Sequence, residues 1–451
     1  MTNAILRGKP DAGNPHVRFE EGEVASAKPR RGSLLYNRRE FIAGAGLLAA
    51  GLCGRKSEAA ESPSCAPSSV APRNRTPYAD VDWKSALQIN TTSHGHCVNQ
   101  QFLDAYLKRS FGFMTISNYY PSAPCWPAAK MTRNYYRVHH DFPVMVDGKR
   151  TDGPFDWNEI VSAWKDELPE KQRAEFPFKE GGPLFPNWPK NLLEAPNAEH
   201  HGFLKADGSS CGAMHICSPG STYASGTFDA HDFFKTVSRG KYDFGSGEFW
   251  QTAFKRMFDG LIVPDGGGVT INHPTWTNLS REFILELLDF DPRVLGIEVL
   301  ENGRNSENYW DWILSTGRQC YGLFVPDWGI KDEVFGVNVL LVPERTVEAC
   351  LRAYRRGEFY GATHGLGELR FTDISWDAQA KTIAASTDKP AKLEVITSRG
   401  VVETATGTSV RWTVPKPAMG WGPRCDRYAR IRATAADGCG EVLYSQATML
   451  Y

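Results

Sequence analysis

The sequence lacks an excess of charge of either sign. Its 451 residues include 51 Lys and Arg against 52 Asp and Glu, and the formal net charge at pH 7 is -1. Proteins bind nucleic acids by placing clustered positive charge against phosphates, and we find no basic stripe along this chain. Hydrophobic residues at 41% and charged residues at 23% are typical of a folded globular protein with a substantial core. The composition therefore gives no support for a nucleic-acid partner.

A stable membrane span is not predicted at the N-terminus. The apolar run at residues 43–52 is too short and too rich in small residues to stay in a bilayer. It follows Asn37-Arg38-Arg39-Glu40-Phe41, and this order resembles a twin-arginine export signal. Small residues at 57–59 suit a signal peptidase. We expect residues 1–59 to be a signal peptide, recognised by the twin-arginine export machinery, and the mature protein to be periplasmic or extracellular.

The cysteine count does not imply a complete disulfide framework. There are ten, and loss of Cys53 with the signal peptide would leave an odd number. Leu52 before Cys53 fits the pattern of a lipid anchor poorly, so we do not expect lipidation. Cys425 and Cys439 flank a strand-like segment and could pair in an oxidising compartment. The cysteines expected to be isolated and buried as small hydrophobes are Cys97, Cys211, Cys217, Cys320 and Cys350.

Apolar strand-like runs alternate with amphipathic helical stretches between residues 78 and 365. Ser280 has the position of an N-cap for one such helix, and residues 293–300 form the strand-like run that follows it. Residues 347–354 have helical spacing and end just before Gly357. This alternation predicts an α/β fold with parallel strands.

The remaining segments have different compositions. Residues 60–77 are rich in Ser and Pro and predict a flexible linker. Residues 120–196 carry many Pro, Trp and charged residues with weak periodicity, which indicates a long insertion over the active face. Residues 366–451 contain short runs that alternate apolar with polar residues, and Asp437-Gly438 is a turn signal. We predict that this last segment is a small all-β domain, a sandwich.

The most informative motif is Thr92-Ser93-His94-Gly95-His96, which follows a short apolar run at residues 86–89. Two imidazoles separated by one residue on an extended segment point to the same side. Both can therefore reach one divalent metal near the edge of a sheet.

Further residues of metal-ligating types lie within or just after later strand-like segments. They are Glu199, His215, His273 and Asp327. Imidazole and carboxylate donors together suit Zn²⁺, Mn²⁺ or Fe²⁺ better than Ca²⁺, which prefers an all-oxygen shell. The pattern predicts a site for one or two divalent transition metal ions. Each residue taken singly also fits a structural role, such as a hydrogen-bonded histidine or a turn cap.

The order of these motifs resembles the polymerase and histidinol phosphatase (PHP) family of metal-dependent phosphoesterases. In that family one strand ends in His-x-His, and later segments bring a metal-bridging Glu, a His, a His-Pro pair and a closing Asp-x-His. The matching positions here are, in chain order, His94 and His96, Glu199, His215, His273 with Pro274, and Asp327. The resemblance covers roughly residues 87–365 and implies a distorted seven-stranded β/α (TIM-like) barrel.

The chain departs from the family pattern at three places. Ser117-Asn118-Tyr119 stands where the family has Thr-Asp-His, and Asp327-Trp328-Gly329 lacks the final His. No acidic residue follows His96 within residues 97–100. The missing ligands argue against a full three-metal cluster and leave a site for one or two ions. The spare imidazoles that could restore ligands are His139, His140, His200 and His201.

The resemblance implies an exported divalent-metal-dependent hydrolase, most simply a phosphoesterase that uses a metal-activated water on a small-molecule phosphate ester. Glu199 would bridge or bind the metal. Arg304 is the best-placed cation for a substrate phosphate, because a guanidinium can hold two oxygens at once. Two alternatives stay open: a degenerate barrel that only binds a ligand or partner, and an amidohydrolase-type enzyme that shares the His-x-His pair.

Overall fold

The computed structural model describes residues 76–450 except for 119–124, 135–143, 147–148, 152–157, 160–161, 169, 224–237, 240–241, 244–247, 331–334, 366 and 417–425. The described residues all belong to one compact unit, residues 69–451. The signal peptide predicted at 1–59, Cys53, and nearly all of the linker predicted at 60–77 lie outside them. Within the described part, no helix is long and apolar enough to cross a membrane.

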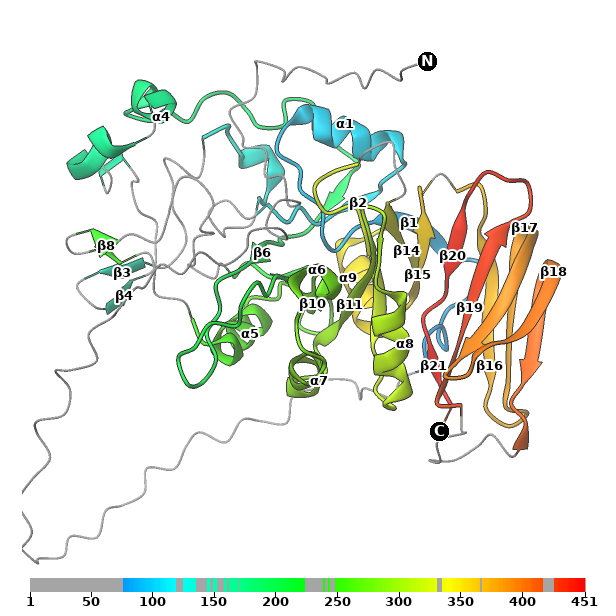
Figure 1. Cartoon of the computed structure of the whole chain (residues 1–451). Coiled ribbons are helices and arrows are strands. Elements are labelled where there is room, and N and C mark those ends of the chain that lie inside the picture. The colour runs from blue at the N-terminus through cyan, green and yellow to red at the C-terminus, as the bar shows by residue number, and fades with distance from the viewer. Residues whose placement is uncertain are drawn as a thin grey trace, which may run out of the picture. The chain divides into compact units, whose positions relative to one another are not determined.

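The larger sheet contains strands from both predicted domains (Figure 1). Its strands, in hydrogen-bonded order, are β1 (Leu87–Thr91), β14 (Gly336–Val342), β15 (Phe359–Thr363), β20 (Val442–Tyr444), β19 (Tyr428–Ala435), β17 (Thr382–Thr397) and β16 (Phe371–Asp377). In addition, β18 (Gly400–Thr413) pairs with β17, and β21 (Thr448–Met449) pairs with β19. The boundary predicted at residue 365 falls between β15 and β16, two strands of this sheet. That boundary and the sandwich stay predictions.

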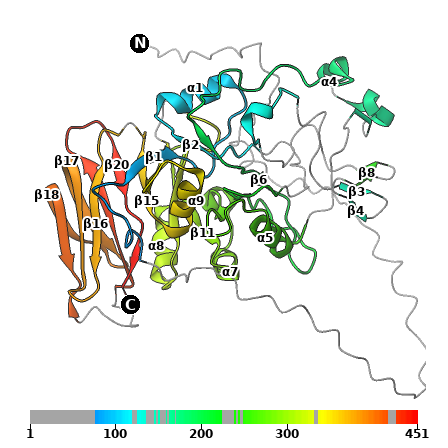
Figure 2. The same cartoon turned by 180° about the vertical axis from the view of Figure 1, so that it is seen from behind.

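All pairings in the larger sheet are antiparallel. The junction between the two halves is the pair of β15 with β20, where Gly361 lies opposite Tyr444. The view from behind also shows the C-terminal strand β20 near β15 (Figure 2). Arg430 of β19 makes a separate contact between the two halves, because its buried guanidinium pairs with Glu307 and Asp311 at 2.6 and 2.8 Å.

The second sheet carries most of the site. Its strands are β12 (Arg304–Asn305), β11 (Val294–Glu301), β10 (Val269–Ile271), β7 (Ile216–Cys217), β6 (Glu199–His200) and β13 (Tyr321–Val325). The pairs β10 with β11 and β11 with β13 are parallel, so the carboxyl ends of these three strands share one edge. The hydrogen-bonded strand orders found among the described residues are open, and the seven-stranded barrel stays a prediction.

The remaining strands of the described residues form two smaller sheets. One pairs β2 (Phe113–Met114) with β5 (Leu193–Glu194) in parallel. The other contains β4 (Lys149–Thr151), β3 (Val144–Val146), β9 (Tyr242–Asp243) and β8 (Ser238–Arg239). The insertion predicted at 120–196 contributes β3, β4, β5, the 3₁₀ turns η1 (Ala128–Lys130) and η2 (Ser162–Glu167), and the short helix α4 (Glu170–Glu175).

The structure also contains the helices α1 (Gln100–Lys108), α5 (Trp250–Asp259), α6 (Pro274–Thr277), α7 (Arg281–Phe290), α8 (Glu307–Ser315) and α9 (Val347–Arg356). Side chains cap the N-termini of three of the longer helices, α1, α7 and α9. Ser280 caps α7 by accepting the Phe283 N–H, which confirms the predicted N-cap. Helix α9 ends at Gly357 in the left-handed conformation, again as predicted.

One of the four core clusters of the described residues lies between the second sheet and its helices. Apolar faces of α5, α7 and α8 pack on β10 and β11 in one continuous cluster that includes fully buried Trp250 and Trp310. The five cysteines predicted to be buried are buried and carry free thiols. Cys439 is exposed and free, and Cys425 lies outside the described residues.

Candidate metal centre

Four side chains from distant parts of the chain converge at one buried point. They are His94, His96, Glu199 and Asp327, and one ligand-type atom from each lies within 4.8 Å of the others. Nε2 of His94 lies 3.0 Å from Oδ1 of Asp327 and 3.3 Å from Oε2 of Glu199. Nε2 of His96 lies 3.0 Å from the same Glu199 oxygen. The structure therefore brings together the two ends of the motif series.

The other oxygen of Glu199 faces a second pair of imidazoles. Oε1 lies 2.9 Å from Nδ1 of His215 and 3.9 Å from Nε2 of His273. These two ring nitrogens are 2.9 Å apart. Glu199 thus stands between two sets of nitrogen donors, with one oxygen turned toward each. All six residues that the sequence analysis selected as metal ligands belong to this centre.

The His-x-His segment reaches the centre by pairing with the end of β13. Gly95 forms a parallel bridge with Asp327, the His96 N–H donates to the Asp327 carbonyl, and the Asp327 N–H donates to the His94 carbonyl. Side chains on either side of Gly95 therefore point the same way, as an extended segment requires. Gly95 leaves little room for a side chain, because a Cβ there would lie 2.7 Å from Cγ2 of Thr92 and from the Tyr106 hydroxyl.

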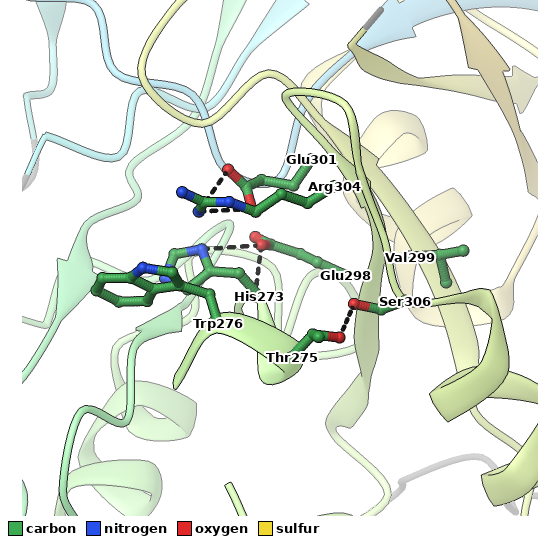
Figure 3. A pocket seen from close by; sticks show the side chains of 8 residues that line it. All are labelled: His273, Thr275, Trp276, Glu298, Val299, Glu301, Arg304 and Ser306. Carbon is green, nitrogen blue, oxygen red and sulfur yellow. Dashed lines mark hydrogen bonds and ion pairs between the residues drawn. The ribbon is translucent and has the colours of Figure 1, made fainter. Parts of the chain in front are cut away.

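Strand β11 supplies two buried carboxylates that the sequence analysis missed, Glu298 and Glu301. Glu298 groups with His94 and His273, and Glu301 groups with His273 and Asp327. Residues three apart on a regular strand face opposite sides, but the register of β11 against β13 shifts between Glu298 and Leu300. Figure 3 shows the result: Glu298 and Glu301 point to one side of β11 and Val299 to the other. The sequence does contain a signal for these residues, because Glu298 and Glu301 are the two acids within the otherwise apolar run at residues 294–301.

Burial and close opposite charges set the pKa values of the carboxylates. Burial alone would raise the pKa of Glu199 and of Asp327, but His94 holds both well below their usual range. Glu301 behaves differently. Burial, with the negative charge of Asp327 adding to it, raises the pKa of Glu301 to about 8. The centre therefore contains both strongly ionised carboxylates and one that holds a proton at neutral pH.

The imidazoles also differ in their pKa values: those of His94 and His273 are raised and that of His215 is lowered. Burial would lower the pKa of His94, but Glu199 and other neighbours raise it well above the usual value. Burial would also lower the pKa of His273, and Glu298 raises it to about 9. Burial lowers the pKa of His215 to about 4, and the His201 ring, stacked on it at a centroid distance of 3.8 Å, adds to this effect. The raised pKa values thus belong to His94 and His273, the two imidazoles that lie next to Glu298.

Arg304 lies at a pocket beside the centre (Figure 3). The side chain of Arg304 is 39% exposed. Its guanidinium pairs with Glu301 at 3.3 Å and lies 5.8 Å from the ring centroid of Trp276. The pocket is lined by His273, Thr275, Trp276, Glu298, Val299, Glu301, Arg304 and Ser306. A guanidinium can hold two oxygens of an anion at once, and the phosphate-binding role of Arg304 stays a prediction.

The spare imidazoles have different positions. His200 turns away from the centre, and its Nε2 lies 3.0 Å from the Ser218 hydroxyl. His201 stays close, with Nε2 3.6 Å from Oε2 of Glu199. His139 and His140 lie outside the described residues. Asn118, at the position where the family has an acid, instead accepts the Cys97 N–H at 2.8 Å and donates to the Cys97 carbonyl at 3.0 Å.

The donor set fits a divalent transition metal. Nε2 of His94 is fully buried and makes no hydrogen bond, although two carboxylate oxygens lie within 3.3 Å of it. A buried polar atom without a hydrogen bond costs free energy, and an ion between the nitrogen and the oxygens would remove that cost. Mixed imidazole and carboxylate donors are typical ligands of Zn²⁺, Mn²⁺ and Fe²⁺.

Comparison with known proteins gives little further information. No family model matches the chain, and no curated protein matches it. Among solved structures the chain is similar to a two-domain protein from Bacteroides vulgatus that contains a predicted PHP-like metal-dependent phosphoesterase. The TM-score is 0.34 and the identity 12%, over 81% of this chain and 95% of that one. Because this likeness is so low, the function proposed below stands on the geometry of the site.

Proposed function

We propose that the chain is a divalent-metal-dependent hydrolase, and specifically a phosphoesterase that acts on a small-molecule phosphate ester. The observation that carries the proposal is the position of Glu199. One of its oxygens faces His94 and His96, and the other faces His215 and His273. A carboxylate between two sets of nitrogen donors is suited to hold one ion or to bridge two.

His94, His96, Glu199 and Asp327 would hold the first ion, and His215, His273 and Glu199 a second. When bound, a divalent metal would lower the pKa of a water and neutralise charge on the phosphoryl oxygens. The protein contributes burial, since three of the first four residues are at most 2% exposed and Asp327 is 3% exposed. A dry site strengthens every charge interaction within it.

Arg304 would bind and orient the substrate. It lies at the open side of the centre, where a phosphate held by its guanidinium would have its oxygens close to His273 and Glu301. Trp276 would limit the space there, because its indole lies 5.1 Å from the His273 ring. We further infer that the chain is exported, on the twin-arginine pattern of residues 37–59 and the small residues that end it.

Elemental analysis joined to a phosphatase assay tests the proposal. The purified protein is expected to carry Zn, Mn or Fe in stoichiometric amount and to hydrolyse a generic aryl phosphate, with activity lost on chelation and restored by the metal. His94→Ala and His273→Ala should each lose metal and activity. His200→Gln is the matched control, because His200 is buried beside Glu199 but faces Ser218.

Three results would count against this function. A folded, metal-free protein that takes up none of these metals would favour the alternative of a binding domain without catalysis. Metal-dependent cleavage of esters or amides, with none of phosphates, would favour the amidohydrolase-type alternative. Equal loss of metal in His200→Gln and His94→Ala would show that burial, rather than ligation, explains the effect.

A further inference from the structure

Glu298 contacts His94 and His273, the first and the last of the four histidines in the motif series. Its Oε1 lies 2.7 Å from Nδ1 of His94, and its Oε2 accepts the backbone N–H of His273 at 2.7 Å. The same Oε2 lies 3.3 Å from Nδ1 of His273. Glu298 is 1% exposed, so these donors take the place of water around its charge.

The distance to His94 is that of a hydrogen bond. The two nitrogens of an imidazole point in different directions, so a histidine that binds an ion through one nitrogen turns the other toward a second partner. Because Nδ1 of His94 gives its proton to Glu298, the opposite nitrogen Nε2 is the one available to a metal. That Nε2 faces Glu199 and Asp327.

The contact with His273 acts on the backbone. His273 has φ 26° and ψ 60°, in the left-handed region that a residue with a side chain rarely adopts. The N–H of this strained residue is held by the Glu298 carboxylate. The conformation places Nε2 of His273 2.9 Å from Nδ1 of His215, on the Oε1 side of Glu199.

We propose that Glu298 is a positioning residue that orients His94 and His273 from behind, so that the ring nitrogens of both face the metal centre. This inference rests on the proposed metal-dependent function. One carboxylate with two oxygens satisfies two donors from different strands, which neither a neutral amide nor a shorter side chain can do in the same geometry. Carboxylates that orient ligating imidazoles in this way commonly change metal affinity about 10–100-fold when they are removed.

Glu298→Gln tests the role, because the amide keeps the shape but has only one acceptor oxygen. In competition with a chromophoric chelator, the variant is expected to bind Zn²⁺ about 10–100-fold more weakly than the wild type, with the melting temperature of the metal-free protein little changed. Glu194→Gln is the matched control. The Glu194 carboxylate also accepts a backbone N–H, from Ala128 at 2.8 Å, and this change should leave zinc affinity as it is.

A measurement on the unchanged protein covers the case in which Glu298→Gln does not fold. With ¹⁵N-labelled histidine, the wild type should show an exchange-protected, strongly downfield Nδ1–H proton from His94, assigned by its loss in His94→Ala. Absence of that signal, or equal zinc affinity in wild type and Glu298→Gln, overturns the role of Glu298 alone. If the wild type binds no zinc, manganese or iron, the proposed function is wrong, and the positioning role of Glu298 toward a metal is wrong with it.

Discussion

Oδ1 of Asp327 lies 3.0 Å from Nε2 of His94, a buried nitrogen that makes no hydrogen bond. Asp327 also bridges the backbone on both sides of Gly95, so its position fixes the His-x-His segment as well as the side-chain cluster. The contact joins the first and last motifs of the chain.

Asp327→Asn is expected to lose bound metal and at least about 100-fold in metal-dependent activity, since direct ligands matter more than outer-shell partners. Asn is the conservative choice because Asp327 has φ 47°, a conformation that Asn tolerates. Metal content per chain and the rate of aryl phosphate hydrolysis are the measurements. Retention of both in the variant would remove Asp327 from the centre.

Arg304→Ala should raise KM for a phosphate ester and leave the metal content unchanged, because Arg304 lies beside the cluster rather than within it. A charge-assisted hydrogen bond contributes about 1.5–3 kcal/mol, which corresponds to roughly 10–150-fold in kcat/KM. Arg318→Ala removes a comparable ion pair, with Asp289 at 2.8 Å, on another part of the surface. Equal kinetics in the Arg304 and Arg318 variants would rule out a substrate role for Arg304.

His200→Gln should change how stability depends on pH. Burial lowers the pKa of His200 to about 3, below the value of 6.5 expected in the unfolded chain. Between these values the unfolded state binds a proton that the folded state does not, so the wild type loses stability as pH falls below 6.5. The stability difference between wild type and variant should therefore shift by up to about 1.4 kcal/mol per pH unit.

Urea unfolding of the metal-free proteins between about pH 4 and pH 8 measures this shift across the range in which His200 titrates in the unfolded chain. The difference is expected to be constant above about pH 7 and to move in favour of the His200→Gln variant as the solution becomes more acidic. A difference that stays the same over the whole range would show that His200 is protonated equally in both states.

Gly296→Ala should destabilise the strand that carries Glu298. A Cβ at Gly296 would lie 1.9 Å from the carbonyl oxygen of Tyr321 on β13, where only backbone movement could make room. We expect a loss of about 3 kcal/mol or more in the free energy of unfolding. Gly182→Ala, with open space around the new carbon, should change it by less than about 0.5 kcal/mol. Similar unfolding midpoints for the two variants would contradict this.

Local patterns in the sequence were enough for several elements. A Ser before an apolar helical face predicts the start of α7, and a Gly after a basic turn predicts the end of α9, because caps depend on a few neighbouring atoms. The same holds for the His-x-His pair, whose geometry follows from one extended segment. The order of the motifs was also informative, since the six residues selected from it lie together.

Contacts between distant strands were not predictable in this way. Glu298 and Glu301 face the centre together only because the register of β11 against β13 shifts between Glu298 and Leu300, and the shift depends on a partner strand. The joining of β15 to β20 likewise places residues of both predicted domains in one sheet. Backbone hydrogen bonds between strands are alike for most residue types, so they leave little trace in the sequence.

The sequence by itself determined which chemistry is available, since residue types alone fix that imidazoles and carboxylates are the donors and that no large charge of one sign is present. Tertiary structure alone decided which of these groups share a site. It turned His200 toward Ser218, brought Glu298 behind His94 and His273, and set Arg304 against Glu301. The physical reason is that a side chain's direction is set by the pairing of its strand, whereas its chemistry belongs to the residue.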